Sequence, residues 1–208
     1  MKKLIHQIKM YFLTVVILFL AITSASCQRN EITIPDFQAS GLILDIGGGG
    51  EGVIGQLKGD QVISIDINKQ ELIDAPSTNL KLVMDARDLK FIDNSFNTVA
   101  IFYTLMYIKE EDHEKVFKEV YRVLKPGGRL LIWDVDLPAS KNNKSELAMY
   151  LFKFNLPNKS INTGYGVHKR EKEQNLEYYF ELATKSGFHS ITSSKTGDSF
   201  YLEVQKNI

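Results

Sequence analysis

A run of four glycines at residues 47–50 directly follows a short apolar stretch at residues 42–46. Glycine allows the backbone to approach a ligand closely, and the free amides at the start of a following helix favour a carboxylate or phosphate. Asp66 ends a second apolar stretch 19 residues after Gly47, near the spacing at which an acid accepts hydrogen bonds from ribose hydroxyls. Together these features predict a nucleoside cofactor. The alternative is a glycine-rich turn with Asp66 as a helix cap.

A second group of polar and aromatic residues could contact a substrate. Tyr103, Tyr107 and Asp134 stand near predicted strand ends, and Tyr165 and His168 lie in the segment after the fifth strand. Such residues can position a nucleophile or accept its proton. Each also has a plainer interpretation, because tyrosines fill cores, aspartates lie in turns and histidines lie in solvated loops. The sequence assigns no catalytic base.

The composition disfavours two other kinds of site. Lysine plus arginine and aspartate plus glutamate both number 25 among the 208 residues, so the chain lacks the broad positive field that binds a phosphate backbone. One cysteine and four scattered histidines form no zinc-binding spacing. We therefore expect neither a nucleic-acid partner nor a metal. With 44% hydrophobic residues, the chain fits one ordinary globular domain.

The elements that must position these residues alternate in type. Apolar runs typical of buried strands occur at residues 42–46, 62–67, 80–84, 98–102 and 129–135. Helical patterns lie between them, at residues 53–57, 69–75 and 112–124. This alternation predicts a parallel α/β sheet whose ligands bind at the carboxyl ends of the strands.

The last third of the chain departs from the simple alternation. A final helix is expected to end near Gly187, with one apolar face formed by Leu176, Tyr179, Phe180 and Ala183. Two short strands at residues 189–194 and 199–205 predict a terminal hairpin. Residues 138–174 predict a substrate-side insert, with a hairpin formed by residues 147–156 and 161–165.

Five blocks of sequence resemble, in this order, the class I S-adenosylmethionine-dependent methyltransferases. The blocks are residues 44–52, 64–67, 84–86, 91–99 and 122–130. The likeness is closest to the small-molecule branch often called type 11. With the alternation, it predicts an α/β, Rossmann-like fold: a mostly parallel seven-stranded sheet with helices on both faces, an antiparallel C-terminal hairpin and a small inserted hairpin.

In this family the glycine loop and the acid before it hold the methionyl part of the cofactor. The resemblance implies this role for Asp45 and for the loop residues Gly47, Gly48 and Gly49. The third alternate glycine of the family would fall on Glu51. Either Glu51 replaces that glycine, or the loop carries one extra residue before Gly52.

The resemblance also assigns the nucleoside part of S-adenosylmethionine. Asp66 would accept hydrogen bonds from both ribose hydroxyls, and Ile67 would pack against the adenine ring. Asp85 and the amide of Ala86 would read the adenine edge. Phe102 would form the floor of the site.

The activity implied by the resemblance is methyl transfer from S-adenosylmethionine to a small-molecule acceptor. This reaction is an in-line displacement with a neutral leaving group. A shaped cavity can therefore supply much of the rate, and a base is needed only when the nucleophile carries a proton. Many relatives have a histidine where Met106 stands, so the resemblance assigns no catalytic residue.

Two other functions share parts of this pattern. An NAD-dependent dehydrogenase would also have a glycine loop and an acid after the second strand, and Tyr121 and Lys125 form a Tyr-x-x-x-Lys pair like that of short-chain dehydrogenases. The pair equally suits a helix that ends in a lysine favoured by the helix dipole. A membrane-attached protein that binds the nucleoside without turnover is the other alternative, because a fold alone does not establish an activity.

The first residues have the layout of a targeting segment. Three lysines precede an apolar run at residues 10–22, and small residues lead to Cys27. This layout resembles a bacterial lipoprotein signal, in which Cys27 would carry the lipid; an uncleaved membrane anchor and a mistaken start codon are the alternatives.

The expected organisation follows from this leader and from the elements after it. Residues 1–26 would be a signal peptide or membrane anchor, residues 27–40 a linker or short cap, and residues 41–208 the methyltransferase domain. The protein would then associate with a membrane through its N-terminus. The side of the membrane and the oligomeric state are left open.

Overall fold

The computed structural model describes residues 30–140 and 146–208. The predicted signal or anchor segment and Cys27 lie outside the described residues. Within the described part of the chain, every helix is too short or too polar to cross a membrane.

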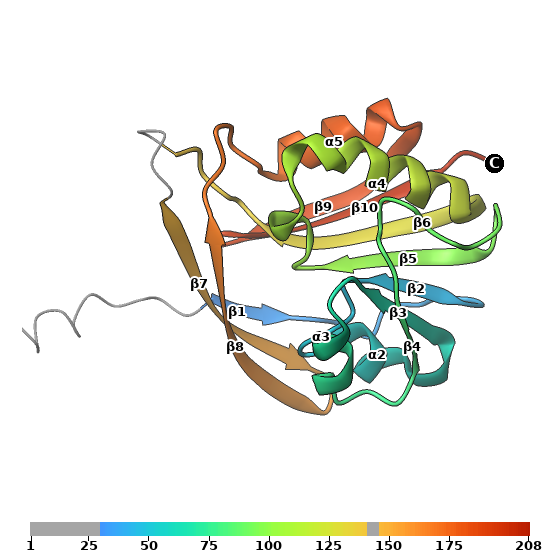
Figure 1. Ribbon diagram of the computed structural model, residues 1–208, viewed down its shortest axis with the longest axis horizontal. Coiled ribbons are helices and arrows are strands. Elements are labelled where there is room, and N and C mark those ends of the chain that lie inside the picture. The colour runs from blue at the N-terminus through green and yellow to red at the C-terminus, as the bar shows by residue number, and fades with distance from the viewer. Residues whose placement is uncertain (1–29, 141–145) are drawn as a thin grey trace, which may run out of the picture.

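The main sheet has seven strands in the order β4-β3-β2-β5-β6-β10-β9 (Figure 1). Its strands are β2 (Ile43–Ile46), β3 (Val62–Asp66), β4 (Leu80–Val83), β5 (Phe96–Phe102), β6 (Leu124–Val135), β9 (Phe188–Thr196) and β10 (Ser199–Lys206). β4, β3, β2, β5 and β6 run parallel, and the β9–β10 hairpin continues the sheet antiparallel to β6. The predicted fold class is confirmed, including its C-terminal hairpin.

Alternating side chains of the central strands supply a core on each face of this sheet. On β5, Val99 and Ile101 join the core that contains α4 (Glu110–Val123) and α5 (Leu176–Lys185). Ala100 and Phe102 join the opposite core, which contains α2 (Val53–Lys58). A further short helix, α3 (Lys69–Asp74), follows β3. Helices therefore cover both faces, and α4 and α5 lie side by side (Figure 1).

The buried face of α5 differs by one position from the prediction. Tyr179, Leu182 and Ala183 are buried, whereas Phe180 is 41% exposed. The helix begins after Asn175, whose side chain accepts a hydrogen bond from the amide of Tyr178 at 3.0 Å. One residue corresponds to about 100° of rotation around a helix, so Phe180 points away from the stripe that Tyr179 and Leu182 share.

A second, three-stranded sheet stands beside the main one. It has the order β1-β7-β8 and consists of β1 (Asn30–Thr33), β7 (Leu147–Leu156) and β8 (Lys159–His168). The inserted hairpin was predicted, but residues 30–33 were expected to be a linker or short cap. They form a strand because Ile32 and Ile34 pack into the same core as Phe152 and Phe154.

The insert leaves and rejoins the domain at a single point. The amide of Leu137 donates to the carbonyl of Gln174 at 2.8 Å, and the amide of Gln174 donates back to Leu137 at 2.9 Å. This two-bond bridge closes the base of the inserted segment. The hairpin lies beside the carboxyl ends of the main-sheet strands (Figure 1), where Phe152 and Phe154 pack on Tyr103 and Phe102.

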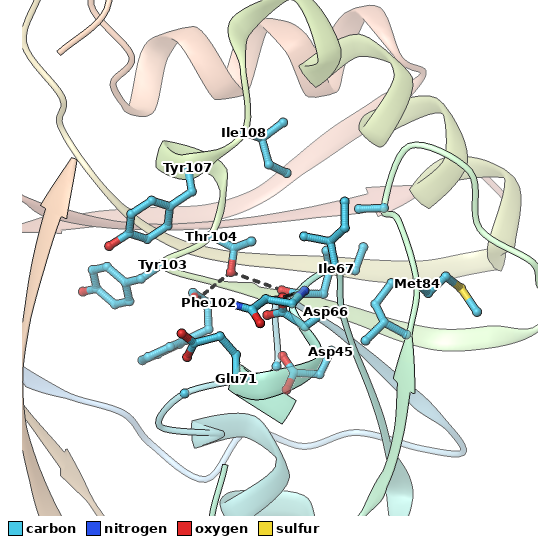
Figure 2. Close-up of a pocket in the computed structure, with 18 of the residues that line it drawn as sticks. Asp45, Asp66, Ile67, Glu71, Met84, Phe102, Tyr103, Thr104, Tyr107 and Ile108 are labelled. Atoms are coloured by element: carbon cyan, nitrogen blue, oxygen red, sulfur yellow. Dashed lines mark hydrogen bonds between the residues drawn. The ribbon is translucent and has the colours of Figure 1, made fainter. Parts of the chain in front are cut away.

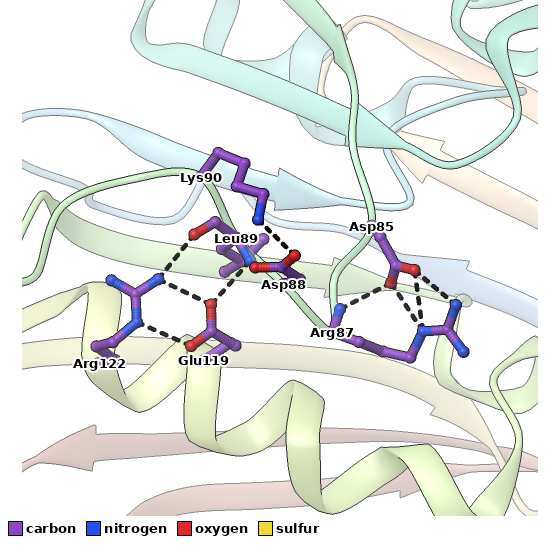
Figure 3. A network of polar contacts seen from close by, with 7 residues as sticks. All are labelled: Asp85, Arg87, Asp88, Leu89, Lys90, Glu119 and Arg122. Carbon is purple, nitrogen blue, oxygen red and sulfur yellow. Dashed lines mark hydrogen bonds and ion pairs between the residues drawn. The ribbon is translucent and has the colours of Figure 1, made fainter.

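Arg122 ties the segment after β4 to the end of α4. Its guanidinium donates to the carbonyls of Leu89 and Phe91 and to the carboxylates of Asp93 and Glu119, each at 2.8 Å. Glu119 in turn accepts the amide of Leu89 at 2.8 Å (Figure 3). This network fixes the stretch of chain that begins at the predicted adenine-binding residues.

Replacing Arg122 with methionine should therefore lower the free energy of unfolding by about 1–3 kcal/mol, because two buried or half-buried carbonyls lose a charged donor. Urea denaturation measures this change. The matched control is Lys90→Met, which removes only an exposed ion pair to Asp88 and should cost less than about 0.5 kcal/mol. Equal losses of unfolding free energy in the two variants would contradict a stabilising role for the Arg122 hydrogen bonds.

The same network predicts a pH dependence. Hydrogen bonding to Arg122 lowers the pKa of Glu119. A carboxylate with a lowered pKa stabilises the fold above its ordinary pKa and loses that contribution as the pH falls. The difference in stability between the native chain and Arg122→Met should consequently shrink in acid.

Candidate active site

A cavity of about 690 Å³ opens at the carboxyl ends of the parallel strands, a size usual for small-molecule sites. It lies where the strand order reverses between β2 and β5, the position at which open α/β sheets bind ligands. All the residues predicted to bind the cofactor line it: Asp45, Gly47, Gly48, Gly49, Asp66, Ile67, Asp85, Ala86 and Phe102. Figure 2 labels Asp45, Asp66, Ile67 and Phe102 among them.

The glycine loop is packed so closely that side chains would not fit in it. Gly47 has φ +73°, and a Cβ at this position would lie 2.1 Å from Oγ1 of Thr104. A Cβ on Gly49 would lie 2.4 Å from the Cβ of Glu71. The amides of Gly47 and Gly48 both donate to the carbonyl of Ile65 on β3, at 2.8 and 3.0 Å. The loop thus presents bare backbone to the cavity.

At the end of the glycine loop, Gly52 and Glu51 have different roles. Gly52, with φ +54°, directly precedes α2 and donates its amide to the carbonyl of Gly49 at 3.0 Å. The Glu51 side chain instead accepts hydrogen bonds from the hydroxyls of Thr163 and of Tyr165, the latter at 3.0 Å. Gly52 therefore takes the left-handed conformation that favours glycine, and the Glu51 side chain joins the loop to the insert. No local pattern in the sequence signals this contact, since its partners lie more than 100 residues away.

Asp45 is a buried carboxylate at the back of the cavity, with only 1% of the residue exposed. Its Oδ2 accepts a hydrogen bond from the hydroxyl of Ser64 at 3.0 Å, whereas its Oδ1 has no partner in the described part of the chain. Burial raises the pKa of Asp45 to about 7; the Ser64 bond opposes this rise and the nearby Asp66 adds to it. Because buried polar atoms are normally paired, Oδ1 marks a place for a ligand donor.

Asp66 and Ile67 stand together where β3 ends. Oδ1 of Asp66 accepts the amide of Asn68 at 2.8 Å, and this bond fixes the carboxylate beside the glycine loop. Ile67 is 67% exposed although it is a large apolar residue at the cavity wall. A flat apolar ring placed against Ile67 would remove that surface from water.

Asp85 is held by a neighbouring guanidinium. Arg87 contacts both oxygens of Asp85, at 2.6–3.0 Å (Figure 3). It also donates to Asp112 on α4 at 2.8 Å. The bonds to Arg87 are the main cause of a lowered pKa for Asp85. The carboxylate is therefore ionised and fixed at the cavity wall beside Ala86.

The predicted substrate residues divide into two sets. Tyr103, Tyr107 and Tyr165 line the same cavity, and Tyr165 reaches it from β8 of the insert. Asp134 and His168 do not line it. His168 is an exposed residue at the end of β8, and Asp134 is buried on β6. The structure therefore brings three of the five candidates together.

Asp134 and His113 position the loop that follows β5. Asp134 accepts the amide of Met106 at 3.4 Å and that of Val135 at 2.8 Å, and burial raises its pKa to about 7. On the other side, the His113 ring lies 3.1 Å from the carbonyl of Leu105, within hydrogen-bonding distance. Both residues thus act through the loop Leu105–Tyr107, which carries Tyr107 into the cavity. His113 was not among the residues predicted from the sequence to belong to the site.

The dehydrogenase-like pair lies outside the cavity lining. Tyr121 packs edge-on against Phe188 and beneath the Lys206 ammonium. Lys125 donates to the side chain of Asn97 at 3.0 Å. Among residues 30–140 and 146–208, no group of three or more histidine, cysteine or acidic side chains could hold a metal ion.

A glycine loop, an acid ending β3 and an acid after β4, all at the switch point of a Rossmann-like sheet, define a nucleoside-binding α/β protein. Residues 44–132 match the family model described as a methyltransferase domain, Methyltransf_11. Residues 44–132 thus form a class I S-adenosylmethionine-dependent methyltransferase domain. The predicted family, enzyme class and cofactor are confirmed.

Curated relatives include ubiquinone/menaquinone biosynthesis C-methyltransferases named UbiE. The chain is 28% identical to that of Pseudomonas savastanoi pv. phaseolicola over 185 residues, which cover 79% of this chain and 72% of the relative. It is 41% identical to that of Desulfotalea psychrophila over 75 residues, which span only 36% of this chain and 29% of that relative.

Solved structures show the same fold. A methyltransferase of Methanosarcina mazei has a TM-score of 0.60 and 20% identity, with 83% of this chain and 95% of that chain covered. Phosphoethanolamine N-methyltransferase 2 of Haemonchus contortus, solved in complex with S-adenosyl-L-methionine, has a TM-score of 0.58 and 18% identity, with 83% of this chain and 50% of that chain covered.

Proposed function

We propose that the cavity binds S-adenosylmethionine at the glycine loop and transfers its methyl group to a small molecule bound beside Tyr103, Tyr107 and Tyr165. The observation that carries this proposal is the unpartnered, buried Oδ1 of Asp45 beside bare glycine backbone. A buried acceptor next to a surface without side chains fits the polar, cationic methionyl end of the cofactor. The mostly acidic lining favours the same positive charge.

The remaining residues suit the nucleoside end. Asp66 offers carboxylate oxygens to ribose hydroxyls, and the exposed face of Ile67 offers apolar contact to adenine. Asp85, fixed by Arg87, and the amide of Ala86 lie farther along the same wall. Asp45, Asp66 and Asp85, at the ends of the neighbouring strands β2, β3 and β4, would thus face the methionyl, ribose and adenine parts in that order.

When bound, the cofactor supplies an electrophilic methyl group and departs as a neutral thioether. The chain's contribution is to hold an acceptor in line with that methyl group, about 3–3.5 Å away, and to exclude water. Tyr103 is fixed for this task by its hydrogen bond to Ser199 and by its ring contact with Phe102. Tyr165 lines the cavity from the side of the insert, where its hydroxyl is held by the hydrogen bond to Glu51.

Calorimetry on the full chain tests the cofactor assignment directly. S-adenosylmethionine should bind and NAD should not, and a labelled methyl group should pass to at least one member of a small-molecule panel. Binding of NAD alone would contradict the proposal. Binding of S-adenosylmethionine with no transfer to any acceptor would favour the alternative of a nucleoside-binding protein without turnover.

The pKa of Asp45 leads to a prediction for pH. Because Asp45 titrates near pH 7 and a cationic ligand favours its ionised form, cofactor affinity should rise between about pH 6 and 8, by at most about tenfold per unit. Calorimetric titrations of the native chain and of Asp45→Asn over this range measure the effect. In Asp45→Asn, the part of the pH dependence that comes from ionisation of Asp45 should be absent. Identical pH profiles for the two proteins would contradict a contact between Asp45 and the cofactor.

Stability should change with pH in the opposite direction. Asp45 and Asp134 both have raised pKa values, so the folded chain binds more protons than the unfolded chain between about pH 4 and 7. Their contribution to the free energy of unfolding should therefore fall as the pH rises through that interval. Urea denaturation of the ligand-free protein checks the sign.

We also propose that residues 1–26 are a lipoprotein signal peptide and that a lipid on Cys27 attaches the enzyme to a membrane. The support is the residue pattern before the first described strand, which begins at Asn30. Cells fed labelled palmitate should label the native chain and the control Ser26→Ala but not Cys27→Ala. Label that persists in Cys27→Ala would contradict lipidation, and unlabelled chain in the membrane fraction would indicate an uncleaved anchor.

A further inference from the structure

The acceptor end of the cavity is formed by aromatic rings set at an angle to one another. The ring centroids of Tyr107 and Tyr165 lie 6.4 Å apart and the rings are nearly perpendicular, at 89°. The Tyr103 ring lies 5.6 Å from that of Tyr165. Tyr107 is 48% exposed although it is held in place by the loop after β5. Aromatic faces open to a cavity attract cations through the negative charge density of the ring.

Two glutamates accompany these rings. Glu51 accepts a hydrogen bond from the Tyr165 hydroxyl at 3.0 Å. Glu71, on α3, also lines the cavity, and its carboxylate has no hydrogen bond or ion pair with any residue in the described ranges. Figure 2 shows Glu71 with its carboxylate turned towards the side occupied by Tyr103 and Tyr107. A free carboxylate near aromatic faces is a second feature that favours a cation.

The phenol of Tyr107 remains protonated in this setting. Burial raises its pKa to about 12, and the charges of Asp134, Glu51 and Glu71 add to the rise. Tyr107 therefore offers a neutral ring and a hydroxyl, and it does not serve as a base. The two glutamates lie close enough to act on a group bound beside this ring.

Basic side chains do little to offset the acidic lining. Six of the described lining residues are acidic and two are basic. Of the basic pair, Arg87 is occupied by Asp85 and Asp112, and Lys109 lies 3.7 Å from Glu111 with its side chain largely exposed. A phosphate or carboxylate on the acceptor would meet repulsion here, because like charges disfavour each other in a confined site.

From this geometry we propose, resting on the function proposed above, that the acceptor is a small amine and that the enzyme is an N-methyltransferase. The amine binds as an ammonium ion against Tyr107 and Tyr165, with its charge facing Glu71 and Glu51. The UbiE relatives are named C-methyltransferases, whereas another curated relative, from Triticum aestivum, is named phosphoethanolamine N-methyltransferase.

The chemical step balances without a further reactant. The ammonium group first releases one proton to water through the carboxylate of Glu71. The nitrogen lone pair then forms the new N–C bond as the C–S bond breaks, and the bonding electrons stay on sulfur. The products are a methylated ammonium ion and a neutral thioether.

A pair of isosteric probes tests the charge preference. Choline and 3,3-dimethyl-1-butanol have the same shape, but the first has a positive nitrogen where the second has carbon. Calorimetry on the full chain saturated with S-adenosylhomocysteine should show choline binding about tenfold tighter or more. Equal affinity, or tighter binding of the neutral alcohol, would overturn the amine assignment.

Variants of the cavity residues show which side chains cause the preference for choline. Tyr107→Leu and Glu71→Gln should each reduce the choline preference several-fold, whereas Tyr107→Phe, which keeps the ring, should retain it. Glu114→Gln is the control, because Glu114 is exposed, pairs with Lys118, and neither residue lines the cavity. A preference that survives both Tyr107→Leu and Glu71→Gln would contradict this placement.

Failure of this proposal and failure of the proposed function give different results. S-adenosylmethionine affinity is measured on the same samples. Absence of that binding would refute the methyl-donor site itself. Normal cofactor binding with no distinction between the two probes would refute only the amine acceptor.

Discussion

Replacing Asp66 with alanine is expected to weaken S-adenosylmethionine binding by roughly 100-fold or more. A carboxylate that accepts two hydroxyl hydrogen bonds contributes about 1.5–3 kcal/mol for each, and about 2.7 kcal/mol already corresponds to 100-fold in affinity. Asp66 lies at the end of β3 with the backbone of Asn68 holding its Oδ1. Its removal therefore takes away acceptors that are already oriented.

Calorimetry on the native chain and three variants measures this loss. Asp66→Asn keeps an acceptor for the Asn68 amide but removes the charge, so its loss should be smaller than that of Asp66→Ala. Asp60→Ala is the control, since Asp60 is an exposed acid in the 3-10 turn Gly59–Gln61 and lies away from the cavity lining. Unchanged affinity in Asp66→Ala would place the ribose elsewhere.

Gly47→Ala is expected to abolish cofactor binding and to lower the free energy of unfolding by about 2–5 kcal/mol. Alanine at a positive φ costs about 1–2 kcal/mol, and overpacking adds about 1–3 kcal/mol. The new methyl group would lie 2.1 Å from Oγ1 and 2.4 Å from Cγ2 of Thr104. Movement of the loop away from Thr104 would distort the cradle beside Asp45.

The control separates backbone strain from crowding. Gly127 has almost the same φ, +72° against +73° for Gly47, but its nearest neighbour to a Cβ is Ile208 at 3.9 Å. Gly127→Ala should therefore cost only the strain and leave cofactor affinity intact. Thermal denaturation and calorimetry measure the two effects. Equal destabilisation of the two variants would mean that the crowding at Thr104 relaxes without cost.

Much of the fold could be predicted because its signals are local. Each parallel strand is a short apolar run, and each predicted cofactor residue stands at the end of one. Parallel strands end at the same edge of a sheet, so Asp45, Asp66 and Asp85 meet in one cavity although they are far apart in sequence. The roles of all three with the cofactor remain predictions, and the variants above test those of Asp45 and Asp66.

The parts that could not be predicted depend on long-range side-chain contacts. Glu51 looked like a departure from the glycine pattern, and its partners Thr163 and Tyr165 come from the insert. The strand at residues 30–33 forms only because β7 of the insert offers an edge. Asp134 has a residue type suited to catalysis, but the amides around it show that it holds a loop. No spacing of residues in the sequence predicts any of these contacts.

The two-bond bridge between Leu137 and Gln174 has an evolutionary consequence. Everything between these residues can be exchanged as a cassette, since the strand before it and the helix after it stay anchored. The part of the enzyme that recognises the methyl donor can thus remain constant while a different inserted hairpin changes the residues that line the acceptor side of the cavity. Each replacement must retain a partner for Glu51, which meets the glycine loop. It must also retain an edge for β1 and apolar side chains that pack on Phe102 and Tyr103.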